Sequence, residues 1–196
     1  MGQGIQNHVS TNINNYTLNA VSEFTYLGST ISSSLSIDTE INRRNGMASA
    51  TLERLSERVW NNPKLSENTK IAVYNTYLII TLLYGGESWT PYSTQENRLN
   101  AFHMFCPRRI LGISWRDKIT STEVLSRAKT ASLVTTFRKC RLHWLGHARL
   151  LEEGRQLPED ILYRELASRK RSTGRPLFVF TDVCKRDMKA CSIDFN

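Results

Sequence analysis

The sequence predicts a mainly helical α+β protein with a short β-hairpin near its N-terminus. From residue 37 onward, apolar residues recur at steps of three and four, which is the period of amphipathic helices. Before that point, Phe24 and Tyr26 alternate with their neighbours, as in a β-strand. The chain has 196 residues and 40% hydrophobic content, so it can bury a core. We therefore expect a helical bundle followed by a helical C-terminal segment.

The hairpin is expected over residues 12–31, after a disordered N-terminus of residues 1–11. Phe24 and Tyr26 would form one aromatic face of its strand. Gly28 would permit a bulge or a close backbone approach at this point.

Two helices are expected next. Ser36 is a suitable N-cap for a helix over about 37–60, which Pro63 would end. Ser66 would cap a second helix that runs to about Tyr84, where Gly85 permits a left-handed C-terminal turn. This second helix is apolar nearly all round, so we expect it to lie in the core.

The rest of the chain also has a helical pattern. A third helix is expected over 94–106, with Pro107 breaking or kinking it. Its inward residues would be Leu99, Phe102 and Phe105. Capping residues then predict a short helix from Thr120 to Ala128, and a long one over 133–151 after Ser132. The buried stripe of the long helix would be Leu133, Phe137, Cys140, Trp144, Leu145 and Ala148. A helix over 159–168, a loop over 169–176 and a weak last helix over 179–191 complete the prediction.

Positive charge is concentrated in one block of the chain. The net charge is +8 overall, yet residues 98–149 alone carry 11 basic and 2 acidic side chains, a net charge of +9. Such a block favours polyanions, with nucleic acid as the first candidate partner. A solvated basic helix face explains the same charge equally well.

Within this block, Arg138, Lys139, Arg141, His147 and Arg149 surround the apolar stripe of the long helix, and Arg108 and Arg109 precede it. These side chains are candidate phosphate ligands, with Trp115 or Trp144 available for stacking on bases. Core packing is the alternative for both tryptophans and is favoured for Trp144. Lys170, Arg171 and Arg175 lie in a basic loop that is also explained by solvation alone.

No catalytic motif or cofactor site is recognisable. The chain has no phosphate-binding loop, nucleophile elbow or zinc-protease helix, and its aspartates are scattered singly, whereas a two-metal site needs converging carboxylates. Cys140, His143 and His147 could share a helix face and hold zinc. Packing of Cys140 as a small hydrophobe is the favoured alternative, so no bound metal is expected.

The four cysteines are widely spaced, and the sequence shows neither an apolar signal segment nor a membrane span. These features predict an intracellular protein, nuclear or cytoplasmic, with reduced thiols and no membrane partner.

Several motifs occur in a specific order along the chain from about residue 13. They are Glu23-Phe-Thr-Tyr-Leu-Gly-Ser-Thr-Ile-Ser32, Ile41-Asn-Arg-Arg44, Val59-Trp60, Leu65-Ser66, Leu83-Tyr-Gly-Gly-Glu-Ser-Trp-Thr90, Arg108-Arg-Ile-Leu-Gly-Ile-Ser-Trp115, Arg141-Leu-His-Trp-Leu-Gly-His147 and Lys170-Arg-Ser-Thr-Gly-Arg-Pro176. This series resembles the C-terminal third of the endonuclease–reverse transcriptases of non-LTR (LINE-type) retrotransposons.

The resemblance implies a role for each segment. Phe24, Tyr26, Leu27 and Gly28 would form the primer grip. The remainder of residues 12–92 would be a thumb-like bundle that cradles a template–primer duplex, with Arg43 and Arg44 among its nucleic-acid contacts. Residues 93–151 would be a basic post-thumb region that engages RNA or DNA, and residues 152–196 a weakly ordered tail.

The same resemblance implies what these residues lack. In such enzymes the paired catalytic aspartates precede the primer grip, but no aspartate precedes Phe24 here. We therefore expect no polymerase activity from this chain alone, and a palm-containing polymerase portion as a possible partner. The remaining alternatives are a protein-interaction or structural remnant, and a fragment without function.

Overall fold

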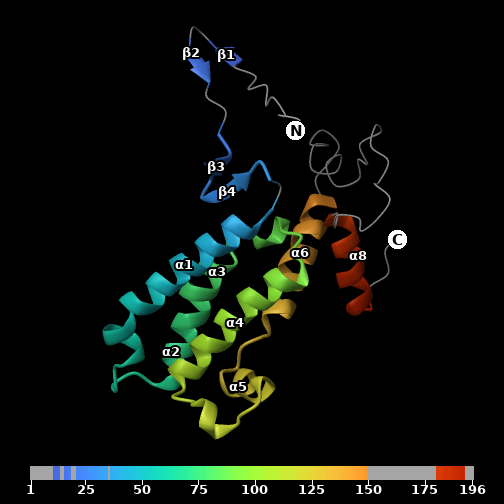
Figure 1. The fold of residues 1–196 in the computed structure, drawn as a ribbon. Coiled ribbons are helices and arrows are strands. Elements are labelled where there is room, and N and C mark those ends of the chain that lie inside the picture. Colours follow the sequence, from blue (N-terminus) through green and yellow to red (C-terminus); the bar gives the residue numbers. More distant parts are fainter. Residues whose placement is uncertain (1–10, 14–15, 19–20, 35, 150–179, 193–196) are drawn as a thin grey trace, which may run out of the picture.

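The computed structural model describes residues 11–13, 16–18, 21–34, 36–149 and 180–192 (Figure 1). The predicted fold class is confirmed, because the described chain is mainly helical with antiparallel strands at its N-terminal end. The expected disordered N-terminus of residues 1–11 was wrong at Thr11, which lies in a strand, and its residues 1–10 lie outside the described residues, as do the helix over 159–168 and the basic loop over 169–176. The division of the chain at residues 92 and 151 stays a prediction.

The N-terminal segment contains two separate hairpins, so the expectation of a single hairpin over 12–31 was wrong. Strand β1 (Thr11–Ile13) pairs with β2 (Tyr16–Leu18), and β3 (Glu23–Tyr26) pairs with β4 (Ser29–Ser32). Leu27 and Gly28 join β3 to β4, with φ angles of 48° and 81°. Two left-handed residues in a two-residue loop match a type I′ turn, whose twist suits antiparallel strands. Gly28 is therefore a turn residue rather than a bulge.

The helical body begins with α1 (Asp38–Arg54), which continues into a π-helical turn, η1 (Ser56–Trp60). The helical segments α2 (Glu67–Val73), η2 (Tyr74–Ile79) and α3 (Ile80–Leu82) then run back along α1 (Figure 1). Ser66 caps α2 as predicted, and Gly85 adopts a φ of 75° just after α3. The N-cap of α1 is Ile37 rather than the expected Ser36, whose hydroxyl accepts from the Asp38 N–H instead.

The short helix η3 (Gly86–Ser88) leads into α4 (Ser93–Ile110), which packs against α1 and α2. Pro107 was expected to break or kink this helix, but α4 continues through it to Ile110. Proline lacks an N–H and so leaves the carbonyl four residues earlier without its helical partner. Here the Tyr74 hydroxyl lies 3.3 Å from that carbonyl oxygen, on His103, and 2.7 Å from His103 Nδ1, so its single proton is shared between the two acceptors. Phe105 was expected to face inward but is 52% exposed, while His103 and Cys106 occupy the buried side of α4.

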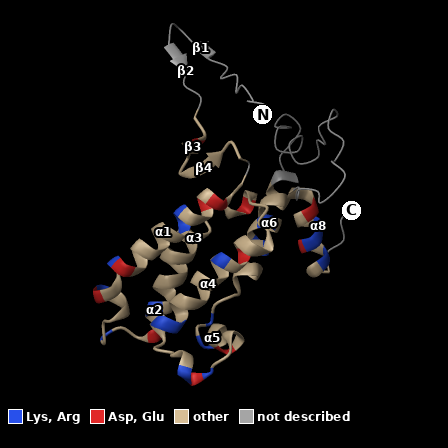
Figure 2. Cartoon of the chain, in the orientation of Figure 1, with Lys and Arg blue, Asp and Glu red and all other residues tan. Residues whose placement is uncertain are grey.

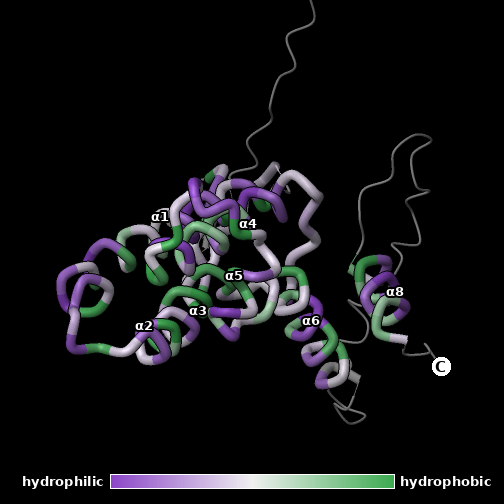
Figure 3. Tube along the Cα trace, turned by 90° about the horizontal axis from the view of Figure 1, so that it is seen from below, coloured by the Kyte–Doolittle hydropathy of each residue, from purple (hydrophilic) through white to green (hydrophobic). Residues whose placement is uncertain are grey.

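Within the described part of the chain, three further α-helices follow, and two of them are capped as predicted. A 3-10 turn, η4 (Trp115–Asp117), precedes α5 (Ser121–Arg127), which Thr120 caps. Ser132 accepts from the Thr135 N–H at the start of α6 (Leu133–Arg149). Helix α8 (Phe180–Ala190) fulfils the expectation of a last helix and lies beside α6 (Figures 1 and 3).

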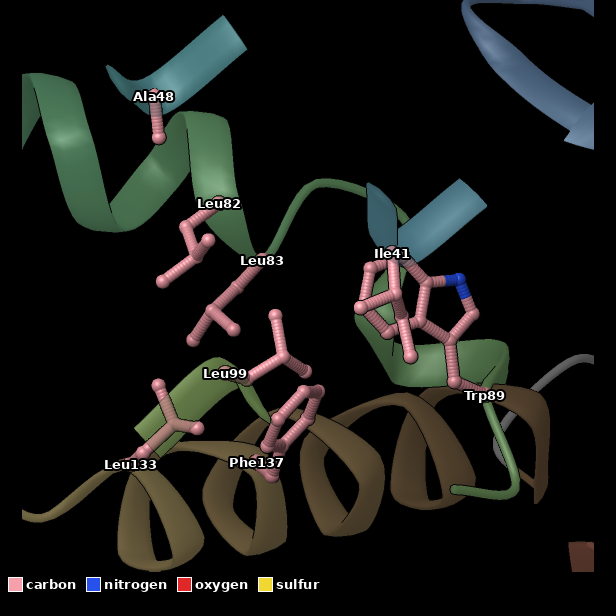
Figure 4. Packing of buried hydrophobic residues seen from close by; sticks show 8 residues of the cluster. All are labelled: Ile41, Ala48, Leu82, Leu83, Trp89, Leu99, Leu133 and Phe137. Atoms are coloured by element: carbon pink, nitrogen blue, oxygen red, sulfur yellow. The ribbon is translucent and has the colours of Figure 1, made fainter. Parts of the chain in front are cut away.

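The core lies between α1, α3, α4 and α6. One cluster of buried side chains, from these helices and from Leu83 and Trp89 in the connection between α3 and α4, is shown in Figure 4: Ile41, Ala48, Leu82, Leu83, Trp89, Leu99, Leu133 and Phe137. A second cluster joins η1, α2, η2 and the C-terminal half of α4. The helix that was expected to be wholly buried has one open face, because Tyr77, Ile80 and Tyr84 are about half exposed. Among the described residues, no helix combines the length and apolarity needed to cross a bilayer.

Candidate nucleic-acid interface

The exposed side of α6 carries a hollow of about 470 Å³ with a basic edge. Successive turns of the helix supply most of its lining, and Cys191, which directly follows α8, supplies the rest. The lining residues are Thr135, Arg138, Lys139, Leu142, His143 and Cys191. Figure 2 colours the lysine and arginine positions of the backbone blue. The hollow therefore lies between α6 and the residue that directly follows α8, which are far apart in the sequence.

Two predicted phosphate ligands meet at this hollow. Lys139 is exposed, and the Arg138 side chain is 28% exposed, with its Nε 3.5 Å from the Asp187 carboxylate. Guanidinium and ammonium groups are the side chains that bind phosphate oxygens best. His147, four residues after His143, is exposed as well. This edge of α6 therefore presents the cationic groups of Arg138 and Lys139 at the hollow.

Arg141 was predicted to join them, but the structure places it inside the protein. Its side chain is 1% exposed, and its Nε and Nη2 lie 2.7 and 2.6 Å from Oδ2 of Asp187, which is equally buried. Its guanidinium also lies 5.5 Å from the Phe137 ring. Arg141 thus ties α6 to α8 and has no surface available for phosphate. The buried stripe of α6 consists of Leu133, Phe137, Arg141 and Leu145.

The regular four-residue spacing of that stripe could have identified Arg141 as a buried residue from the sequence. The expected stripe instead passed through Cys140, which is exposed. Asp187 was missed altogether, because a single aspartate 46 residues away carries no local signal for its partner.

Arg43 and Arg44 were also predicted to contact nucleic acid, but both hold the β3–β4 hairpin against α1. Arg44 is 4% exposed, and its Nε lies 2.6 Å from Glu40 Oε1. Arg44 also donates to the Gly28 carbonyl, and Arg43 donates to the same oxygen at 3.1 Å. Thr30 N–H donates to the second Glu40 oxygen at 2.8 Å. We call Glu40, Arg43 and Arg44 the hairpin clamp.

The clamp has an electrostatic consequence. Burial acts to raise the pKa of the Glu40 carboxyl, but hydrogen bonds from Arg44 and Thr30 outweigh it and lower that pKa. The Arg44 guanidinium also lies 4.5 Å from the Tyr84 ring, and the Tyr84 hydroxyl donates to the Leu27 carbonyl at 3.0 Å. The hairpin turn is thus held both by α1 and by Tyr84, which lies two residues after α3.

The hairpin presents apolar side chains to solvent. Phe24, Tyr26, Leu27 and Ile31 are between 56% and 75% exposed. The four predicted primer-grip residues, Phe24, Tyr26, Leu27 and Gly28, therefore lie together at an accessible end of the molecule (Figure 1). A rigid backbone with exposed rings is suited to contact a partner surface.

Arg108 and Arg109 are directed to intramolecular partners rather than to the α6 edge. Arg108 donates to the Ile119 carbonyl at 2.9 Å, and Arg109 donates to Ser56 Oγ at 2.8 Å and to Glu53 at 3.2 Å. Arg149 is the last residue of α6, and its side chain is not described. Lys170, Arg171 and Arg175 lie outside the described residues.

The candidate zinc ligands do not form a site. Among the residues that the structure describes, no three His, Cys, Asp or Glu side chains are grouped so that they could share a metal ion. Cys140, His143 and His147 are all exposed on α6. The favoured alternative for Cys140, burial in the apolar stripe, was also wrong, because Cys140 is exposed.

Comparison with known proteins gives one informative similarity. The chain is 22% identical over 181 residues to an uncharacterized protein of Caenorhabditis elegans that is described as transposon-derived. The similarity covers 90% of this chain but only 64% of the relative, so this chain spans about two thirds of the relative's length. No protein-family profile matches the sequence, and no solved structure matches it.

Proposed function

We propose that this chain is a transposon-derived protein that binds nucleic acid, and that it descends from the reverse transcriptase of a non-LTR retrotransposon. The transposon-derived relative supports the origin, since its similarity covers 90% of the chain. The ordered motifs supply the reverse-transcriptase assignment. The basic edge of the α6 hollow, formed by Arg138 and Lys139, is the observation that carries the binding function.

Binding at this edge would be electrostatic and independent of sequence. Arg138 and Lys139 would each contact a backbone phosphate and release the counterions condensed there. Nothing in this mode reads a base edge, so RNA and DNA would both be ligands. We propose that these residues bind without catalysing a reaction, with any polymerase chemistry supplied by a palm-containing portion. The proposed place of action is inside the cell, in the nucleus or cytoplasm.

The test is the salt dependence of binding to a labelled DNA duplex and to an RNA–DNA hybrid, followed by fluorescence anisotropy. The double variant Arg138→Gln, Lys139→Gln should bind more weakly. Its plot of log K against log salt should be shallower by about two, because each phosphate contact contributes about 0.9 to the slope. Arg141 must be retained, since its loss would disturb the fold rather than the surface.

The matched control is Arg54→Gln, Arg58→Gln, which removes the same charge from exposed positions around the end of α1. This control should keep the wild-type slope. Equal slopes for both double variants would show that only overall charge matters and would contradict the α6 interface. No salt-dependent binding of the duplex or the hybrid by the wild type would contradict duplex binding by this chain.

A second candidate function is protein binding through the β3–β4 hairpin, and the exposed rings on its clamped backbone favour it. The palm-containing portion of a reverse transcriptase is the partner that the primer-grip resemblance implies. In its absence we expect the exposed face to cause self-association, which Phe24→Ser, Tyr26→Ser should reduce in sedimentation velocity. A wild-type chain that stays monomeric at high concentration would argue against this function.

A further inference from the structure

Trp115 is the most exposed large hydrophobic side chain that the structure describes, at 82%. Trp60 and Trp89 are each 5% exposed, and Trp144 packs edge-on against Phe180 with 5.3 Å between ring centroids. Trp115 lies in the loop between α4 and α5, at the end of the helical body opposite the β3–β4 hairpin (Figure 1). Core packing, one of the two roles considered for Trp115, is therefore excluded.

The turn that presents the indole is held by its own hydrogen bonds. The Ser114 N–H donates to Asp117 Oδ2 at 2.6 Å, and the Ser114 hydroxyl accepts from the Arg116 N–H at 3.4 Å. Lys118 then adopts a left-handed φ of 52°, which ends the turn. At its far end the loop is anchored by Arg108, which donates to the Ile119 carbonyl at 2.9 Å. A backbone fixed in this way lowers the entropy lost when the indole binds a ligand.

The surroundings of the indole are cationic rather than apolar. The Arg116 guanidinium lies 5.6 Å from the Trp115 ring, and Lys118 is exposed. The Asp117 carboxylate accepts from the Ser114 N–H and keeps its negative charge, so Arg116, Asp117 and Lys118 together carry a net charge of +1. Ser114, Arg116, Asp117 and Lys118 are all exposed, so this surface lacks the contiguous apolar area typical of a protein-docking patch.

An aromatic ring beside positive charges is the arrangement that proteins use for single-stranded nucleic acid. Every base offers a π-face for stacking, and phosphates on either side bind arginine and lysine. Stacked bases inside a duplex do not offer a free face to the indole. We propose that Trp115 stacks on an unpaired base, while Arg116 and Lys118 contact the flanking phosphates. This inference rests on the proposed nucleic-acid function and gives it a second ligand class, single strands.

Tryptophan fluorescence provides a direct test, because a stacked base quenches indole emission and Trp115 is the tryptophan that solvent reaches most. Titration with a dT12 oligonucleotide should quench the tryptophan emission of the wild type. It should not quench the emission of the variant Trp115→Ala, which keeps the other tryptophans. Trp115→Ala should also bind dT12 between about 5-fold and 150-fold more weakly, since one stacked base contributes about 1–3 kcal/mol. Its circular dichroism spectrum and duplex affinity should match the wild type.

Two comparisons isolate the base. A 12-nucleotide abasic strand keeps the phosphates of dT12 but should neither quench Trp115 nor distinguish wild type from Trp115→Ala. The variant Trp144→Phe should retain quenching by dT12. Equal affinity of the wild type for dT12 and for the abasic strand would overturn the inference. So would quenching by anionic lipid vesicles with none by dT12, which would assign the indole to a membrane surface.

The two proposals fail in different ways. If duplex binding responds to Arg138→Gln, Lys139→Gln while dT12 leaves Trp115 emission unchanged, the stacking role is wrong and the α6 interface stands. If dT12 quenches Trp115 but no salt-dependent duplex binding occurs, the single-strand site stands and the α6 interface is wrong.

Discussion

At the scale of single residues, arginine has two opposite roles on α6. Arg138 keeps part of its side chain in solvent at the edge of the hollow, whereas Arg141 is buried against Asp187. Charge counting along the sequence cannot separate these roles, because both residues add one positive charge. What separates them is their position around the helix, since Arg141 continues the apolar stripe and Arg138 does not. A buried guanidinium then requires a carboxylate from another element.

The first prediction concerns this pair. Replacing Asp187 with Asn should destabilise the fold by about 3–5 kcal/mol, because it leaves the Arg141 charge buried without its counterion. Urea denaturation followed by circular dichroism measures the loss. The matched control is Asp182→Asn on the same helix, at a partly exposed position, which should cost much less.

The double variant Asp187→Leu, Arg141→Met should recover much of the stability lost in Asp187→Asn, since it removes both charges at once. An Asp187→Asn protein as stable as the wild type would mean that the pair does not hold α8 against α6.

The second prediction concerns His103, which is 1% exposed. Its Nε2 lies 3.1 Å from the Ala131 carbonyl, which can only accept, so Nε2 carries the proton of the neutral ring. Its Nδ1 lies 2.7 Å from the Tyr74 hydroxyl. Burial lowers the pKa of His103 below its ordinary 6.5, and the bond to Ala131 opposes that shift.

Because the unfolded chain then binds a proton more readily than the folded one, stability must fall as pH drops below 6.5. By pH 5 the loss is at most about 2 kcal/mol, at 1.36 kcal/mol per pH unit. Urea unfolding at pH 5, 6, 7 and 8 should show this trend in the wild type and in His143→Gln, whose imidazole is exposed. The same trend in His103→Gln would assign the pH dependence to another group.

At the scale of elements, the β3–β4 hairpin shows that a strand can be located from the sequence while its contacts with another element cannot. The alternation around Phe24 and Tyr26 predicted a strand, and the structure has one there. The family resemblance implied that Arg43 and Arg44 contact nucleic acid. In the structure, the carbonyl oxygen of Gly28 lies in the turn of the hairpin, and Arg43 and Arg44 both donate to it. A contact between α1 and a turn 15 residues earlier produces no periodic pattern in the sequence, so it could not be predicted.

The third prediction follows from the hairpin clamp. Replacing Arg44 with Met should release the hairpin, because it removes the bonds to Gly28 and Glu40 and the cation–π contact with Tyr84. Amide hydrogen exchange should then speed up in β3 and β4 while α3 and α4 keep their protection. The control Arg43→Gln removes only exposed contacts and should have a smaller effect. Uniform loss of protection would instead assign Arg44 to the global core.

At the scale of the whole molecule, the sequence predicted the helical architecture well. Caps at Ser66, Thr120 and Ser132, together with the three- and four-residue periods, located most helices because those signals are local. Errors arose where a distant partner changes the local rule. Pro107 lies inside α4 with the Tyr74 hydroxyl beside the carbonyl that it leaves without a helical donor, and Arg141 is buried because Asp187 pairs with it. The α6 hollow needs both α6 and Cys191, so no single segment predicts it.

The last prediction tests the assembled fold through its four cysteines. Cys106 is buried in the second core cluster, and Cys184 is buried between α6 and α8, whereas Cys140 and Cys191 are exposed. Burial raises the pKa of Cys106 to about 12 and that of Cys184 to about 11, so both stay protonated and unreactive near neutral pH. In the native protein, Ellman's reagent should therefore modify two thiols quickly, and in urea all four.

The identity of any third reactive thiol locates the weakest part of the structure. Peptide mapping of partly modified protein should find Cys184 next and Cys106 last, because Cys184 belongs to the small cluster that holds α8, whereas Cys106 requires opening of the main helical body. Asp187→Asn should accelerate the Cys184 reaction and leave Cys106 protected in native buffer. If Cys106 instead reacts as fast as Cys191 in the wild type, α4 does not lie in a core as described.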